Sequence, residues 1–84
     1  MTRQEILYKI GEILCDEASL DTPEELTMET DFRKDLQLDS LEMINLVTIF
    51  DEEFDITVDD SRLTSINTAK DAVDIIEELL GEAE

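Results

Sequence analysis

The sequence contains no histidine, no tryptophan, one cysteine, one proline and two glycines among its 84 residues. Without histidine, the chain cannot build a nucleophile–histidine pair or a Cys/His zinc site from its own residues. A single thiol, Cys15, also excludes an internal disulfide, which is typical of a reducing compartment. Because proline and glycine are the usual turn formers, their scarcity favours helix.

Basic residues are also scarce, because six Lys and Arg stand against 24 Asp and Glu, for a net charge of −18. Nucleic acids and anionic membrane surfaces are bound through Lys and Arg, so we expect neither as a partner. No apolar run approaches the roughly 20 residues of a transmembrane helix, and the charged start of the chain does not resemble a secretory signal. We therefore predict a cytoplasmic protein whose partners are basic where they touch it.

The length of the chain allows one small domain spanning residues 1–84, expected to be a monomer and too small for an enzyme with a deep pocket. Apolar residues at helical spacing predict main helices at 2–18, 39–54 and 69–80, a short one at 58–63, and a long first loop at 19–38. We therefore expect an all-α, small four-helix bundle. Its core-facing residues would be Ile6, Leu7, Ile10, Ile13, Leu14, Met43, Leu46, Val47, Phe50, Phe54, Ala72, Val73, Ile76, Leu79 and Leu80.

Several local signals refine these boundaries. Asp39 followed by Glu42 resembles a capping box, and Thr68 followed by Asp71 repeats the pattern. Gly81 suits the position just after a helix. We also expect an N-cap at Thr57. The first loop would be held to the core by Leu26, Phe32 and Leu36. In the first helix, Tyr8 and Cys15 are expected to lie off the core.

The second helix carries apolar residues that its core face does not explain. Leu41 and Ile44 fall on the opposite side of the helical wheel, beside polar residues. These neighbours are Asn45, Thr48, Asp51 and Glu52. Residues 35–61 hold nine acids and no Lys or Arg. An apolar pair rimmed by acids is typical of a docking surface, while the alternative is a solvated acidic face that keeps the protein soluble.

Ser40 lies at the start of this helix, where its hydroxyl is expected near solvent. Backbone amides at a helix start favour negative charge, which suits a phosphodiester on this oxygen. A serine that follows an aspartate at a helix start is, however, more often a simple cap. A catalytic role is disfavoured because the chain holds no base to activate the hydroxyl. Cys15 has acidic neighbours that disfavour its thiolate, so we interpret it as incidental.

The run of residues 35–41, D-L-Q-L-D-S-L, closely resembles the phosphopantetheine attachment motif of acyl carrier proteins, D-L-G-x-D-S-L. The resemblance continues through residues 42–55. Three residues depart from the family pattern. Gln37 stands where glycine is common, which we expect to alter the turn; Asn45 replaces a common acid; and Thr48 replaces a common apolar residue. The first loop is also longer than expected.

The resemblance implies that Ser40 Oγ receives 4′-phosphopantetheine from coenzyme A, delivered by a phosphopantetheinyl transferase. The chain would then be a carrier and not an enzyme, presenting thioester-bound acyl groups of fatty-acid or polyketide biosynthesis. Its further partners would be acyl-transferring, condensing or reducing enzymes with basic docking patches. Acyl chains would slip between the helices near the adaptable Met43. The residues that the resemblance assigns to partner recognition are Asp39, Leu41, Glu42, Ile44, Asp51 and Glu52.

Other interpretations share parts of this pattern. An aminoacyl or peptidyl carrier, such as a D-alanyl carrier, has the same serine motif, and an unmodified acidic helical adaptor would need no prosthetic group. A calcium-binding loop of the EF-hand type requires glycine at its sixth position. Counting from Asp51 or Asp55 places Ile56 or Asp60 there, so we predict no such metal site.

Overall fold

The structure is a computed structural model that describes residues 2–17 and 20–81. In chain order its helices are α1 (Arg3–Glu17), the 3-10 helix η1 (Pro23–Glu25), α2 (Ser40–Phe54), α3 (Asp60–Leu63) and α4 (Ala69–Leu80). Within the described ranges the only β-type pairing is one isolated bridge between Asp31 and Thr68. The predicted all-α class, with three main helices and a short one, is confirmed. None of the described helices is long and apolar enough to cross a membrane.

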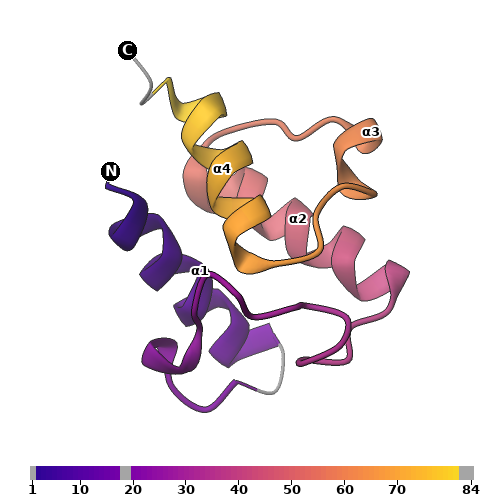
Figure 1. The fold of residues 1–84 in the computed structure, drawn as a ribbon. Helices are drawn as coiled ribbons and strands as arrows, with labels where there is room; N and C mark the ends of the chain where they lie inside the picture. The colour runs from indigo at the N-terminus through magenta and orange to yellow at the C-terminus, as the bar shows by residue number, and fades with distance from the viewer. Residues whose placement is uncertain (1, 18–19, 82–84) are drawn as a thin grey trace.

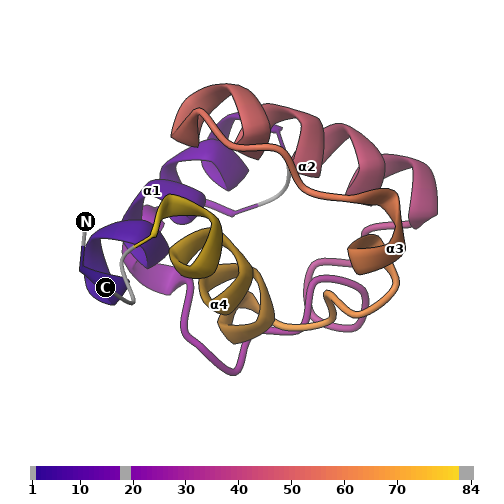
Figure 2. The ribbon, with the colours of Figure 1, turned by 90° about the horizontal axis from the view of Figure 1, so that it is seen from above.

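The three main helices enclose one core within a body of 33 × 26 × 21 Å (Figures 1 and 2). The start of α1 and the end of α4 lie at the same end of the molecule, where Arg3 bonds Asp74 at 2.6 Å and Glu77 at 2.7 Å. In Figure 1 the long loop passes beneath α4 and reaches the side of the molecule away from the N-terminus, where α2 begins. This route places the N-terminus of α2 at an outer corner of the bundle.

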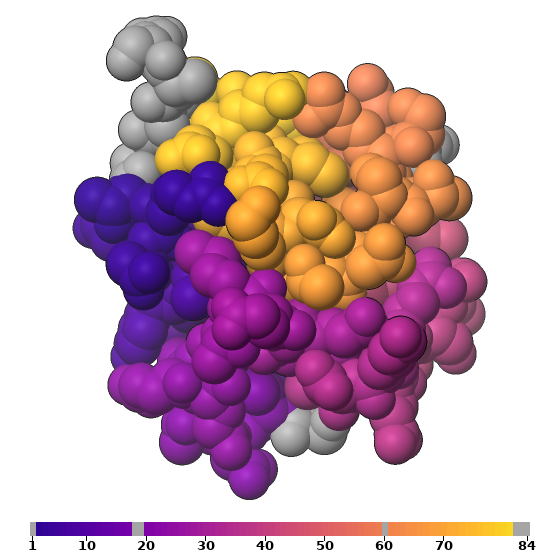
Figure 3. Space-filling model, viewed as in Figure 1, coloured from indigo at the N-terminus to yellow at the C-terminus, as the bar shows by residue number. Residues whose placement is uncertain are grey.

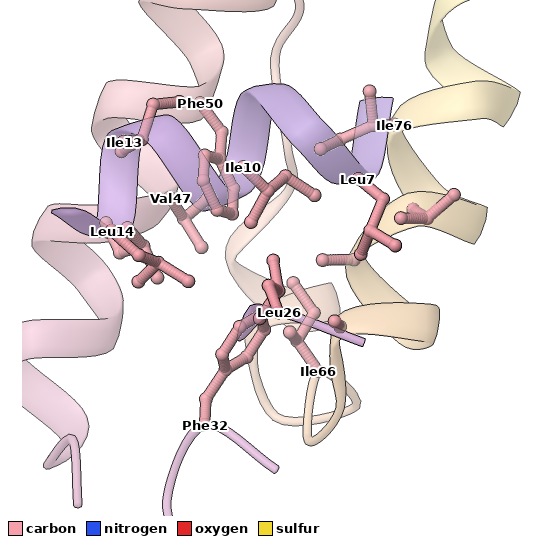
Figure 4. Packing of buried hydrophobic residues seen from close by; sticks show 14 of the residues in the cluster. Leu7, Ile10, Ile13, Leu14, Leu26, Phe32, Val47, Phe50, Ile66 and Ile76 are labelled. Atoms are coloured by element: carbon pink, nitrogen blue, oxygen red, sulfur yellow. The ribbon is translucent and has the colours of Figure 1, made fainter. Parts of the chain in front are cut away.

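The core contains every apolar residue that the sequence assigned to the inner faces of α1 and α2. Figure 4 shows part of this core, where Ile10 and Leu14 of α1 lie near Val47 and Phe50 of α2. Two expectations at the core edge are wrong. Leu79 is 38% exposed, because it lies in the last turn of α4, where few neighbours remain to cover it. Cys15 is half-buried against the core, since the segment after α1 folds back along that helix. Leu80 is also half-buried, whereas Tyr8 is exposed as expected.

The first loop is more ordered than its polar sequence indicates. It contains η1, and Leu26 and Phe32 are buried as predicted, while Leu36 is half-buried against the core. In the space-filling view the loop covers the lower part of the molecule between α1 and the region of α2 (Figure 3). It approaches α1 closely at Gly11, where an added Cβ would stand 2.8 Å from the carbonyl oxygen of Pro23. The absence of a side chain at that position lets the loop pack directly on the helix.

The two C-terminal helices begin differently, because Thr68 caps α4 through its side chain whereas Asp59 makes no side-chain cap hydrogen bond to α3. The predicted N-cap at Thr57 is wrong, because α3 begins after Asp59. For α4 the expectation is confirmed: Thr68 Oγ1 accepts a hydrogen bond from the Asp71 amide, and Asp71 Oδ2 accepts one from the Thr68 amide. Gly81 ends α4 with φ 74°, a left-handed conformation that glycine adopts without strain.

Candidate functional site

The N-terminus of α2 is capped by Asp39 and not by Ser40. Asp39 Oδ1 accepts a hydrogen bond from the Glu42 amide at 2.8 Å, and Glu42 Oε1 accepts one from the Asp39 amide at 3.1 Å. This reciprocal pair is the predicted capping box, and it satisfies two of the amides that a helix start leaves open. Ser40 is then the first helical residue, and its side chain is not needed to hold the helix end.

Ser40 presents its hydroxyl to solvent. The residue is exposed, and within residues 2–17 and 20–81 no group hydrogen bonds its side chain. The amide of Met43 donates to the carbonyl of Asp39, while those of Ser40 and Leu41 find no acceptor in the described chain. Open amides at a helix start give a local field that favours negative charge. The residues present therefore fit a phosphodiester joined through Ser40 Oγ.

The turn that leads into Ser40 is fixed on both sides. Leu38 is buried, and its amide donates to the carbonyl of Phe32 at 3.0 Å. Gln37 adopts φ 57°, in the left-handed region that favours glycine. The residue that departs from the family motif thus takes a glycine-like backbone conformation. The buried leucine then directs the chain outward at the next two residues.

The outward face of α2 carries the exposed apolar pair expected from the sequence. Leu41 is 66% exposed and Ile44 is 47% exposed. The exposed polar residues around them are Asp39, Glu42, Asn45, Thr48 and Glu52. The Thr48 hydroxyl donates to the carbonyl of Ile44 at 2.9 Å, which keeps it on its own helix. The structure thus brings Ser40 and five of the six predicted recognition residues together on the exposed side of one helix.

Asp51 differs from the other five. It is half-buried, and its Oδ1 accepts a hydrogen bond from the amide of Val58 at 3.1 Å. This bond ties the segment after α2 back onto the helix. One oxygen of the Asp51 carboxylate therefore has a structural partner, a role that sequence reasoning missed because the acceptor and donor belong to different segments.

A hollow of about 170 Å³ lies beside the start of α2 and was not expected from the sequence. Four apolar residues and three polar ones line it: Leu14, Leu38, Leu46, Ile49, Glu17, Glu42 and Asn45. It forms where α1, the end of the first loop and α2 meet, so no single periodic pattern reveals it. Met43, which the resemblance placed near a carried chain, is buried in the core.

Cys15, the only thiol, is poorly suited to chemistry. Burial raises the pKa of the Cys15 thiol, and the negative charge of Asp16 raises it further. Because the thiolate is the reactive form, this environment keeps the side chain inert. The raised pKa agrees with the sequence-based interpretation of Cys15 as an incidental residue.

Comparison with known proteins gives consistent matches. A family described as "phosphopantetheine attachment site" matches residues 9–82. The acyl carrier protein of Petrotoga mobilis is 39% identical over 80 residues, covering 95% of this chain and 93% of its own. The acyl carrier protein of Rubrobacter xylanophilus is 40% identical over 78 residues, covering 93% and 95%. The crystal structure of the acyl carrier protein of Thermotoga maritima superposes with a TM-score of 0.81 at 31% identity, covering 98% of this chain and 94% of that one.

Proposed function

The chain belongs to the acyl carrier proteins, and from that premise we propose that Ser40 is the residue that carries its phosphopantetheine group. Members of this family are carriers and not catalysts, and 4′-phosphopantetheine is their cofactor. The group ends in a thiol that holds an acyl chain as a thioester. Ser40 supplies the oxygen to which the group is joined, and α2 supplies the surface that partners contact.

The observation that supports this assignment is that Asp39, and not its neighbour Ser40, caps α2. Asp39 caps α2, so the Ser40 hydroxyl is exposed and has no hydrogen-bond partner in the described chain. The interpretation of Ser40 as a simple cap loses its support for the same reason. Because no carboxylate of the described residues hydrogen bonds the Ser40 hydroxyl, the base that takes its proton during attachment would come from the transferase.

The partner-facing surface is centred on Leu41 and Ile44. Asp39, Glu42 and Glu52 surround them with negative charge, which would steer a basic docking patch toward Ser40. Carriers of this family act with a transferase and with enzymes that use the carried group. Those of this chain would be acyl-transferring, condensing or reducing enzymes of fatty-acid or polyketide synthesis.

The relatives named above favour acyl over aminoacyl cargo, because they are acyl carrier proteins. We assign the whole of residues 1–84 to one carrier domain, which a single shared core supports. A monomer fits the strongly negative charge, since copies of the chain repel one another. A cytoplasmic location fits the single cysteine, which is typical of a reducing compartment.

The proposal is tested by loading the purified chain. The protein is incubated with coenzyme A, Mg²⁺ and a transferase of broad specificity, and its intact mass is measured. The parent should gain the mass of one phosphopantetheine group, and Ser40→Ala should gain none. Ser61 offers a matched control, because it is also an exposed serine that follows an aspartate. Loading of Ser40→Ala, or loss of loading in Ser61→Ala, would contradict the assignment.

A further inference from the structure

Two of the six basic residues lie in the loop that precedes Ser40, and they differ from the other four in their ion pairing. Each of the others forms an ion pair, and the pairs are Arg3 with Asp74 and Glu77, Lys9 with Glu53, Arg62 with Glu78, and Lys70 with Asp74. Arg33 and Lys34 are exposed and form no ion pair with any residue that the structure describes. In a chain with 24 acids, two adjacent cations without acidic partners call for an explanation.

The nearest carboxylates in the sequence are engaged by the backbone. Asp31 Oδ1 accepts hydrogen bonds from the amides of Arg33 at 2.9 Å and Lys34 at 2.8 Å. Asp35 Oδ2 accepts one from the amide of Asp31 at 2.8 Å. These bonds make the turn of residues 31–35 rigid. Both carboxylates support the turn, while the two cationic side chains extend into solvent.

The same turn lies close to Ser40 in space. The Leu38 amide bonds the carbonyl of Phe32 at 3.0 Å, so the end of the loop returns to its beginning. Arg33 directly follows Phe32, and Ser40 comes two residues after Leu38. The cations and the proposed attachment residue therefore belong to one corner of the molecule. Phe32 is fully buried and anchors that corner to the core.

We propose that Arg33 and Lys34 form the positive half of the docking surface and contact acidic side chains of the transferase that modifies Ser40. This inference rests on the proposed function of Ser40. The acids of α2 attract a basic patch. In the 31–35 turn the exposed Arg33 and Lys34 balance the charges of Asp31 and Asp35, so this turn adds no net negative charge and offers two cations to acidic groups. A transferase that covers both must carry basic groups opposite α2 and acidic groups opposite the turn. Charges of both signs select one orientation on the carrier, which negative charge alone would not do.

A protein surface suits these cations better than a small anion does. Both side chains are exposed, and neither lines the hollow beside α2 or two further hollows beside α1. A small phosphate group is usually held by several converging donors in a recess, whereas exposed cations outside a recess match acidic side chains on a facing surface.

Two charge reversals of equal size test the proposal. Lys34→Glu and Lys70→Glu each change the net charge by −2, and Lys70 is exposed on another element, α4. If only the total charge steered a basic transferase, both variants would load as fast as the parent or faster. We expect Lys34→Glu to load about two- to five-fold more slowly than Lys70→Glu at low salt, the effect of one exposed ion pair, and the difference to vanish at high salt. Equal or faster loading of Lys34→Glu would overturn the proposal.

A second measurement separates the transferase from the phosphates of coenzyme A. The affinity of the transferase of the source organism for the unloaded chain is measured without coenzyme A, and Lys34→Glu should weaken it by a similar factor. Lys34→Arg, which keeps the positive charge, should bind the transferase as tightly as the parent does. A loss of affinity that appears only with coenzyme A present would assign the cations to its phosphates and overturn the inference. Failure of the Ser40 assignment would appear differently, as a parent chain that does not load or a Ser40→Ala variant that does.

Discussion

Asp39 and Glu42 exchange two hydrogen bonds across the first turn of α2, and Ser40 lies between them without taking part. Each carboxylate accepts the other residue's amide, at 2.8 and 3.1 Å. The pair holds the helix start rigid while the serine side chain stays available. A modification site needs both properties, because the oxygen must be reachable and must also be presented at a defined place.

The cap and the charge of Asp39 can be separated by two substitutions. Asp39→Ala removes the acceptor and should lower the free energy of unfolding by about 1 kcal/mol, whereas Asp39→Asn keeps an oxygen acceptor and should cost little. If the charge of Asp39 also steers partners, Asp39→Asn should still load more slowly at low salt. Urea unfolding and initial loading rates measure the two effects. A large loss of stability in Asp39→Asn would contradict the role of a neutral acceptor in the cap.

Gln37 has a backbone conformation that a glycine would adopt more easily. With φ 57°, its Cβ is crowded by the backbone, at a cost of about 1 kcal/mol. Gln37→Gly should therefore raise the free energy of unfolding by up to about 1 kcal/mol, despite the greater freedom of glycine in the unfolded chain. Gln4→Gly in α1 should do the opposite, because its backbone is helical. Lower stability of both variants would show that Gln37 is not strained.

The sequence predicted the helices well, because apolar spacing and capping residues are local signals. Asp39 and Thr68 were identified as caps since each is followed by an acid three residues later. Thr57 was not distinguishable from Asp59 by the same reasoning, because both types cap helices and the start of α3 depends on how the preceding segment packs. Leu79 was misassigned because periodicity gives the face of a helix but not what covers it.

The site could be predicted only in part. The motif pointed to Ser40, and helical geometry placed Leu41 and Ile44 outward, as the structure confirms. Two features depend on how side chains and backbone pair in the folded chain and had no sequence signal. One is the hydrogen bond from the Val58 amide to Asp51, and the other is that Arg33 and Lys34 form no ion pair with any described residue.

Gly11 is required by the close approach of the first loop to α1. A Cβ at this position would lie 2.8 Å from the Pro23 carbonyl oxygen, a backbone atom that cannot move without shifting η1. Gly11→Ala should therefore lower the free energy of unfolding by about 1–3 kcal/mol, although alanine is the better helix former. Glu12→Ala, at an exposed position of the same helix, should be nearly neutral. Higher stability of Gly11→Ala would show that the loop is free to retreat.

The link between α1 and α4 should give stability a small dependence on pH. The Arg3 guanidinium, hydrogen bonded to Asp74, holds the pKa of that carboxyl below its usual range. A carboxyl with a lowered folded-state pKa stabilises the fold above its unfolded value of about 3.9, and this contribution is lost as the pH falls through the folded pKa. Because both side chains are partly exposed, the effect should be well below 1 kcal/mol.

Arg3→Gln should therefore lose less stability than the parent between about pH 5 and pH 3, since it lacks this contribution throughout. Urea unfolding at several pH values measures the difference. Arg33→Gln is the control, because it removes a cation that pairs with no described residue, and its curve should run parallel to that of the parent. A parallel curve for Arg3→Gln would show that the pair contributes nothing to the acid sensitivity.

Asp51 and Glu52 are adjacent acids with different tasks, and neutral substitutions should separate them. Asp51 accepts the Val58 amide at 3.1 Å, whereas Glu52 is exposed on the outward side of α2. Asp51→Ala should lower the free energy of unfolding by about 1 kcal/mol, because a partly buried amide loses its acceptor. Glu52→Gln should leave stability unchanged within about 0.5 kcal/mol and slow loading of Ser40 at low salt, with recovery at high salt. If Asp51→Ala were as stable as the parent, the carboxylate of Asp51 would be free to steer partners. If Glu52→Gln loaded at the parent rate, the carboxylate of Glu52 would be dispensable for loading. Both results together would reverse the assignment made from the contacts of the two residues.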